Sequence, residues 1–191
     1  PRHAHLQALW PNLECCVHGG LPVDPFQDDL RSALGPGVNF HEVYPTAEGF
    51  IAAQDAESGR GLRLLTDTGL FFEFLPLRES DETNLAQLGP RAVPLAGVQP
   101  GVDYVLLVTT PAGLCRYVLG DIVNFVSTDV PRVVWVGHAG HRLNAFGEQV
   151  IERDLSAALL GACQRHGWQV VNYHVAPLFA NSALGQTRGR H

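Results

Sequence analysis

The chain has 191 residues, and its 19 acidic side chains outnumber 13 basic ones, which gives a formal net charge of −6 at neutral pH. All 13 basic side chains are arginine, and no basic stripe occurs that would neutralise the phosphates of a nucleic acid. The length allows one large domain or two small ones, and the longest apolar runs are far too short to span a membrane.

The residue pattern of the first part of the chain predicts strands that alternate with helices. Residues 3–10 read as the end of a helix, and residues 13–18 as a short strand that runs into two glycines. An Asp-Pro pair supplies the capping and first-turn signals for a helix over 24–34. Another strand is expected over 38–44, and it leads into a loop.

The next part predicts two paired strands, over 50–56 and 61–77, the second of which contains a turn. Its aromatic side chains are expected in the core: Phe71, Phe72 and Phe74. Glu73 lies among them, and a buried carboxylate needs a charged partner. Arginine is the only fixed cation in this chain, so we predict an arginine beside Glu73.

The centre of the chain predicts a hairpin over 104–121. Residues 105–108 are apolar on both faces, which is typical of a strand that is covered on both sides. A turn follows at Pro111, Ala112 and Gly113, and the second strand reaches Asp121 and continues over 122–126. Before this hairpin, we expect an exposed loop over 79–90 and an irregular connection over 91–101.

The last part predicts one buried strand, one helix and one further strand. The buried strand covers 133–136, and the helix covers 148–166 and ends at Gly167. The apolar face of this helix consists of Val150, Ile151, Leu155, Ala158, Leu159 and Ala162. Residues 168–175 alternate as a strand, and the small and polar residues 177–191 predict a loop.

Asp121 is the first candidate for a functional side chain. It follows Gly120 at the expected end of the second strand of the hairpin, where side chains tend to leave the core and meet a ligand. A carboxylate has several acceptor lone pairs and can hold two neighbouring sugar hydroxyls, so we predict that Asp121 binds the ribose of a nucleotide. The alternative is that it merely closes a turn.

Four segments carry a resemblance to a known family. They occur in this order along the chain: G-G-L-P at 19–22, Y-P-T-A-E-G at 44–49, F-F-E-F-L-P-L at 71–77 and R-Y-V-L-G-D at 116–121. The last resembles the R-Y-x-x-G-D signature of the auxin-responsive Gretchen Hagen family, the acyl-acid amido synthetases of the adenylate-forming ligase superfamily. Four motifs in the family's order make the resemblance specific.

The resemblance implies an α/β fold in two parts. Residues 1–137 would form the C-terminal portion of the large nucleotide-binding domain, a mixed sheet or distorted barrel with helices. Residues 138–191 would form the hinge and the beginning of a small, mobile α+β domain. We therefore expect the chain to be a piece of a longer protein, and it opens Pro1-Arg2-His3 without methionine.

The resemblance also implies a site for ATP and Mg²⁺. Its nucleotide-binding residues would be Gly19, Gly20, Val43, Tyr44, Thr46, Ala47 and Asp121. The glycines would lie against adenine and Tyr44 would stack on it, while Glu48 would be the magnesium ligand, since Mg²⁺ takes one or two protein carboxylates together with phosphate oxygens. The hydroxyl residue that usually precedes the glutamate is Ala47 here, which leaves Thr46 as the nearby substitute.

His138 stands where the family usually has arginine or lysine, after the hinge glycine. The resemblance implies that it contacts the ribose or phosphate and acts with Glu48 in catalysis. Histidine is charged only part of the time at neutral pH. The alternative is a metal pair with His141, although no Cys or Asp accompanies the two histidines.

The reaction that the resemblance implies has two halves. A carboxylic acid attacks the α-phosphorus of ATP to form an acyl-adenylate, and the amine of an amino acid then displaces AMP to form an amide. A phosphate loop and a small-domain lysine are missing from these residues, so we expect the piece alone to be inactive. The alternatives are a ligase that passes the acyl group to coenzyme A, and a nucleotide-binding module without catalysis.

The composition also predicts a compartment and a source. The four cysteines show no C-x-x-C spacing, so we expect reduced thiols in a cytoplasmic protein. No signal peptide opens the chain. The use of arginine without lysine or methionine suits a bacterial genome of high GC content, so we expect a bacterial protein.

Overall fold

A computed structural model describes residues 6–20, 23, 26–56, 59–77, 90–141, 150–170 and 173–176. Its helices are α1 (Leu6–Leu9), α2 (Gln27–Leu34) and α3 (Glu152–His166), with short 3-10 turns at Leu95–Gly97 and Ala139–His141. Its strands are β1 (Cys15–His18), β2 (Asn39–Thr46), β3 (Gly49–Ala53), β4 (Leu62–Leu64), β5 (Phe71–Pro76), β6 (Val93–Pro94), β7 (Asp103–Thr109), β8 (Tyr117–Ser127) and β9 (Arg132–His138). The predicted α/β class is confirmed.

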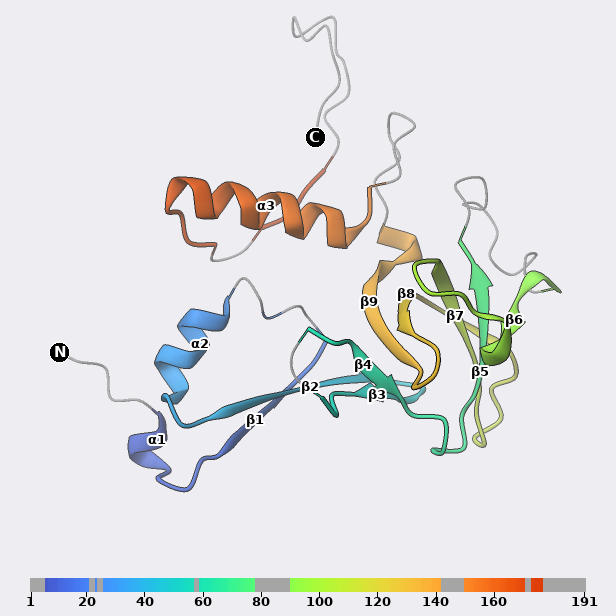
Figure 1. Ribbon diagram of the computed structural model, residues 1–191, viewed down its shortest axis with the longest axis horizontal. Helices are drawn as coiled ribbons and strands as arrows, with labels where there is room; N and C mark the ends of the chain where they lie inside the picture. Colours follow the sequence, from blue (N-terminus) through green and yellow to red (C-terminus); the bar gives the residue numbers. More distant parts are fainter. Residues whose placement is uncertain are drawn as a thin grey trace, which may run out of the picture.

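The strands form a single mixed sheet in the order β1-β2-β3-β4-β9-β8-β7-β5-β6. β1 pairs with β2 in parallel, and every other neighbouring pair is antiparallel. Figure 1 shows β1 and β2 running out from the curled part of the sheet, with α2 on one side of them. The predicted hairpin becomes β7 and β8, and its turn is closed by the Gly113 amide, which donates to the Thr110 carbonyl.

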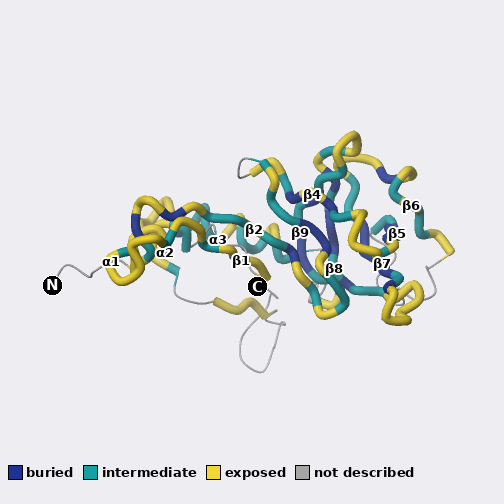
Figure 2. The backbone as a smooth tube through the Cα atoms, turned by 90° about the horizontal axis from the view of Figure 1, so that it is seen from below, coloured by how far each residue is buried: buried dark blue, intermediate teal, exposed yellow. Residues whose placement is uncertain are grey.

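The core lies on both faces of β7, as its sequence predicts. Tyr104, Leu106 and Val108 join a large cluster with Phe74 and Phe125, which also includes Tyr44 from β2. The alternating side chains Val105 and Leu107 join a second cluster, which contains Ile122, Val136 and Ile151. In Figure 2 the buried backbone is concentrated in β7, β8 and β9, whereas α1 and α2 are exposed or half-buried.

The prediction of a single strand with an internal turn over 61–77 is wrong. β3 pairs with β4 as expected, but β4 and β5 are separated in the sheet by β9, β8 and β7. The turn between them therefore carries the chain across the sheet and closes no hairpin. Phe72 and Phe74 are buried, but Phe71 is 58% exposed because it begins β5 and its neighbours along the strand face the other way.

The C-terminal predictions are only partly confirmed. α3 ends as expected, with Gly167 in a left-handed conformation (φ 65°) and its amide bonded to the Cys163 carbonyl. The predicted start of the helix is too early, because Val150 and Ile151 lie before α3 and Ile151 is its extended, buried N-cap. The other members of the predicted apolar face are not buried, and the one buried residue of α3 is Cys163. The predicted strand does not form over 168–170 or 173–176, and Trp168 is 65% exposed and stacks on His166 at 4.7 Å between ring centroids.

Several predicted segments lie wholly or partly outside the described residues. These are the first residues of the expected helices, at 3–5, 24–25 and 148–149, the loop over 79–89 and the tail over 177–191. The described part of the second helix begins with Phe26 at its cap.

Candidate functional site

A bulge in β8 presents Asp121. Val105 of β7 pairs with Ile122, and Leu107 pairs with Val118, so four steps along β8 match two steps along β7. Gly120 takes a left-handed conformation (φ 86°) inside this bulge. Bulges re-aim side chains, and Asp121 therefore lies within β8 rather than at the end of a strand.

Two donors from other strands hold the Asp121 carboxylate. The Tyr44 hydroxyl donates to Oδ2 at 2.6 Å, and the Trp135 indole N–H donates to Oδ1 at 3.3 Å. Burial of the phenol raises the pKa of Tyr44 far above its ordinary value, and the charge of Asp121, its hydrogen bond and the charge of Glu48 raise it further. Tyr44 consequently remains a protonated donor at any physiological pH.

The β2–β3 hairpin carries Tyr44 and the residues that follow it. Thr46 pairs with Gly49, which leaves Ala47 and Glu48 as the two turn residues. The Thr46 hydroxyl donates to the Gly49 carbonyl at 3.2 Å, so its proton is used within the turn. Glu48 is half-buried and lies close enough to Tyr44 for its charge to affect that phenol.

The two glycines after β1 have different surroundings. A Cβ on Gly19 would lie 2.2 Å from the Val43 carbonyl oxygen, so this glycine is needed for the close approach of β1 to β2. Gly20 has φ 89°, and a Cβ there would meet nothing within 4 Å. Gly19 therefore serves packing within the protein, whereas Gly20 faces open space.

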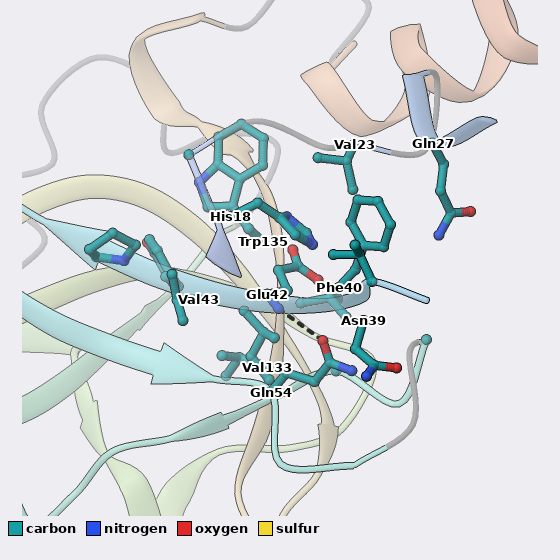
Figure 3. A pocket seen from close by; sticks show the side chains of 18 of the residues that line it. His18, Val23, Gln27, Asn39, Phe40, Glu42, Val43, Gln54, Val133 and Trp135 are labelled. Atoms are coloured by element: carbon teal, nitrogen blue, oxygen red, sulfur yellow. Dashed lines mark hydrogen bonds between the residues drawn. The ribbon is translucent and has the colours of Figure 1, made fainter. Parts of the chain in front are cut away.

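A cavity of about 600 Å³ joins several of these residues. Gly20, Val43, Tyr44 and Asp121 line it, whereas Gly19, Thr46, Ala47, Glu48 and His138 do not. Figure 3 shows further side chains around the same space, and its dashed line marks the Glu42 amide donating to the Gln54 side chain. The remaining polar lining residues that the sequence did not single out include His18, Gln27, Arg31, Asn39 and Trp135.

Trp135 and His18 are the main site residues that sequence reasoning missed. Trp135 lies in the apolar run of β9, where nothing in the local pattern distinguishes a core indole from one that faces a carboxylate. His18 is the last residue of β1, and its Nδ1 is buried with no hydrogen-bond partner in the described part of the chain. Its position directly before two glycines was the available signal.

His138 lies beside Asp121 but faces Gly120. The two residues are paired between β8 and β9, and a Cβ on Gly120 would lie 2.5 Å from His138 Nε2. His138 Nδ1 accepts a hydrogen bond from the Gly140 amide at 3.1 Å. Within the described ranges, no three His, Cys, Asp or Glu side chains gather as a metal-binding group, and the His141 side chain lies outside them.

Arg116 is the arginine that Glu73 was predicted to need. Its Nε and Nη2 donate to the two Glu73 carboxylate oxygens at 2.8 and 2.9 Å, and the Glu73 side chain is only 17% exposed. The hydrogen bond and charge of Glu73 raise the pKa of Arg116. This bidentate pair joins the segment just before β8 to β5, so the first residue of R-Y-V-L-G-D is engaged by the protein itself.

Comparison with known proteins identifies the family. Residues 63–138 match the model described as GH3 family central domain. This chain contains the GH3 family central domain. The predicted family is confirmed, and the matched segment includes β5 and the entire β7–β8 hairpin with Arg116 and Asp121.

Three GH3 relatives illustrate the likeness. A probable indole-3-acetic acid-amido synthetase, GH3.6 of rice, is 34% identical over 85% of this chain and 31% of its own length. The jasmonoyl–L-amino acid synthetase JAR4 of Nicotiana attenuata is 31% identical over 74% of this chain and 25% of its own. A human GH3 domain-containing protein is 31% identical over 79% of this chain and 29% of its own.

Solved structures of GH3 enzymes support the fold. The acyl acid amido synthetase AtGH3.15 in complex with 2,4-DB superposes with a TM-score of 0.64 at 24% identity, over 84% of this chain and 28% of that one. This level of identity shows the fold alone. The chain spans about a third or less of the length of the GH3 proteins named here.

The relatives correct the predicted source. They come from rice, Nicotiana and human, and none is bacterial, so the expectation of a bacterial protein is wrong. Among the described residues, no helix is both long and apolar enough to cross a membrane.

Proposed function

We propose that this chain provides the adenosine-binding side of an ATP-dependent acyl acid amido synthetase, which adenylates a carboxylic acid and transfers the acyl group to an amino acid amine. One observation carries the proposal. The Y-P-T-A-E-G and R-Y-V-L-G-D segments meet through the 2.6 Å bond from Tyr44 to Asp121, beside a cavity of about 600 Å³. The GH3 relatives named as amido synthetases support the reaction class.

In this proposal, adenosine occupies the cavity next to Asp121. The carboxylate would accept hydrogen bonds from the ribose hydroxyls, since each oxygen has a lone pair beyond the one used by Tyr44 or Trp135. Gly20 leaves the open space that a flat base needs. Tyr44 is only 7% exposed, so a base would meet just the part of its ring that lines the cavity, beside Val43.

The residues of the β2–β3 turn fit a magnesium ion held jointly with a nucleotide. A single half-buried carboxylate, Glu48, stands at the turn, and Mg²⁺ commonly takes one protein carboxylate with phosphate oxygens and water. Bound there, the ion would offset phosphate charge during the attack on the α-phosphorus. The chain's own task is to position the acid and the nucleotide in line.

The hinge is also a proposal. We assign residues 1–137 to the large domain and 138–191 to the hinge and the start of the small domain, with His138 as the hinge residue that contacts the nucleotide. The His138 ring lies over Gly120 of the bulge, so movement at this position would be felt directly beside Asp121. The four cysteines are free thiols, in keeping with a proposed cytoplasmic location.

One observation favours a second function, a nucleotide-binding module without catalysis. Ala47 brings no hydroxyl to the turn, and the Thr46 hydroxyl already donates its proton to Gly49. The turn residues described here therefore lack a free side-chain donor for the α-phosphate.

Acid-dependent exchange of pyrophosphate into ATP tests the proposal, and it is measured on the protein in its complete natural form. Exchange with an acyl acid and Mg²⁺, greatly reduced in Asp121→Asn, would support a synthetase. Asp129→Asn is the matched control, because Asp129 is exposed in the β8–β9 turn. Binding of AMP without exchange for any carboxylic acid in a broad panel would favour the non-catalytic module.

A further inference from the structure

Asp121 is held from two directions. Trp135 belongs to β9, the neighbour of β8, whereas Tyr44 belongs to β2, and β3, β4 and β9 lie between β2 and β8 in the sheet. The Tyr44–Asp121 bond therefore joins two strands that are not neighbours in the sheet. The two donors reach different oxygens of one carboxylate.

We propose that Trp135 and Tyr44 are positioning residues, which fix the plane of the Asp121 carboxylate so that one acceptor site on each oxygen faces the cavity. Indole is a donor only, and the buried phenol stays protonated. Rotation of the carboxylate about its Cβ–Cγ bond would break both hydrogen bonds, so the two remaining acceptor sites keep a constant direction. This inference rests on the proposed function of Asp121 in binding ribose.

The arrangement predicts a particular ligand chemistry. Two acceptor sites on adjacent oxygens of a fixed carboxylate match two vicinal hydroxyls, each of which donates one hydrogen bond. A ligand with only one of these hydroxyls leaves one acceptor site unsatisfied. The site should therefore prefer ribonucleotides over 2′-deoxy and 3′-deoxy nucleotides, and this preference should depend on Trp135 as well as on Asp121.

The test compares the binding of AMP, 2′-deoxy-AMP and 3′-deoxy-AMP by calorimetry to the protein in its complete natural form. Trp135→Phe keeps an aromatic ring but removes the donor to Oδ1. We expect AMP to bind about tenfold more weakly, the size of one lost hydrogen bond to a charged group, while the deoxy nucleotides change much less. Trp168→Phe is the matched control, because Trp168 follows α3 and is 65% exposed. This variant should bind all three nucleotides as the unaltered protein does.

Tyr44→Phe provides a second variant, which removes the donor to Oδ2 and should lower the same ribose preference. Equal weakening of AMP and both deoxy nucleotides by Trp135→Phe and Tyr44→Phe would overturn the inference, because a purely structural role gives that result. Asp121→Asn separates this failure from failure of the proposed function. If Asp121→Asn leaves the ribose preference intact, Asp121 does not bind ribose; if it abolishes the preference and the two donor variants do not, only the positioning role is refuted.

Discussion

Tyr44→Phe removes one oxygen atom and tests the contact on which the site depends. The hydroxyl donates to Asp121 Oδ2 at 2.6 Å, and the side chain is 7% exposed. Phenylalanine fills nearly the same space, so the variant isolates the hydrogen bond from packing. The Asp121 carboxylate then keeps only the longer bond from Trp135, at 3.3 Å.

The expected loss of stability follows from the partners. A hydrogen bond to a charged acceptor contributes about 1.5–3 kcal/mol to stability. Asp121 is half-buried and borders the cavity, so water can replace part of the lost bond. We therefore expect the free energy of unfolding to fall by about 1.5–2 kcal/mol, toward the lower end of that range.

Urea denaturation of Tyr44→Phe, Asp121→Ala and the double variant gives the coupling energy between the two side chains. Tyr104→Phe is a matched control: Tyr104 is also buried, but its hydroxyl accepts a bond from the Gln99 amide at 2.9 Å. A neutral bond of this kind is worth about 0.5–1.5 kcal/mol, and it should show no coupling to Asp121. A coupling between Tyr44 and Asp121 below about 0.5 kcal/mol would refute the reasoning, because that is the scatter of independent sites.

Three further predictions concern the surroundings of the site. Folding raises the pKa of Tyr44, so the stability that this phenol contributes is present below about pH 10 and is lost as the pH rises further. Above about pH 10, the urea midpoint of the unaltered protein should therefore fall more steeply than the midpoint of Tyr44→Phe. Gly19→Ala should lower the free energy of unfolding, measured by urea denaturation, by about 1–3 kcal/mol, because the added Cβ would overlap the Val43 carbonyl. The control, Gly161→Ala in α3, should leave this free energy unchanged or raise it. Arg116→Lys should lower the melting temperature, since an ammonium group cannot reproduce the two parallel bonds to Glu73; a melting temperature equal to that of the unaltered protein would show that the pair is not stabilising.

Local pattern was enough to predict the central hairpin, and the order of the family motifs indicated that two of their segments meet. The apolar run of β7 indicated a strand covered on both faces, and the two core clusters confirm it. Motif order indicated that the Tyr44 segment and Asp121 lie together, and a hydrogen bond joins them. The need of Glu73 for an arginine was also correct, because burial of a carboxylate imposes it whatever the fold.

The pairing of strands that lie far apart in the sequence could not be predicted from local pattern. The turn after β4 resembles a hairpin turn, yet the strand that follows pairs with β7, because pairing depends on the whole sheet and not on adjacent residues. The alternation over 168–175 indicated a strand, but alternation forms one only where a neighbouring strand is available. Trp135 gave no signal, since its role depends on a carboxylate that lies 14 residues away in the sequence.

The R-Y-V-L-G-D segment is engaged at three points by three different strands. Arg116 binds Glu73 of β5, Gly120 provides room for the His138 ring of β9, and Asp121 accepts from Tyr44 of β2. These contacts fix the bulge of β8 before any ligand binds, and the only signature side chain left facing the cavity is the Asp121 carboxylate. A site built in this way spends little conformational entropy on ordering its acceptor when a ligand arrives, because folding has already oriented it. The stability of the sheet and the direction of that carboxylate therefore depend on the same set of contacts.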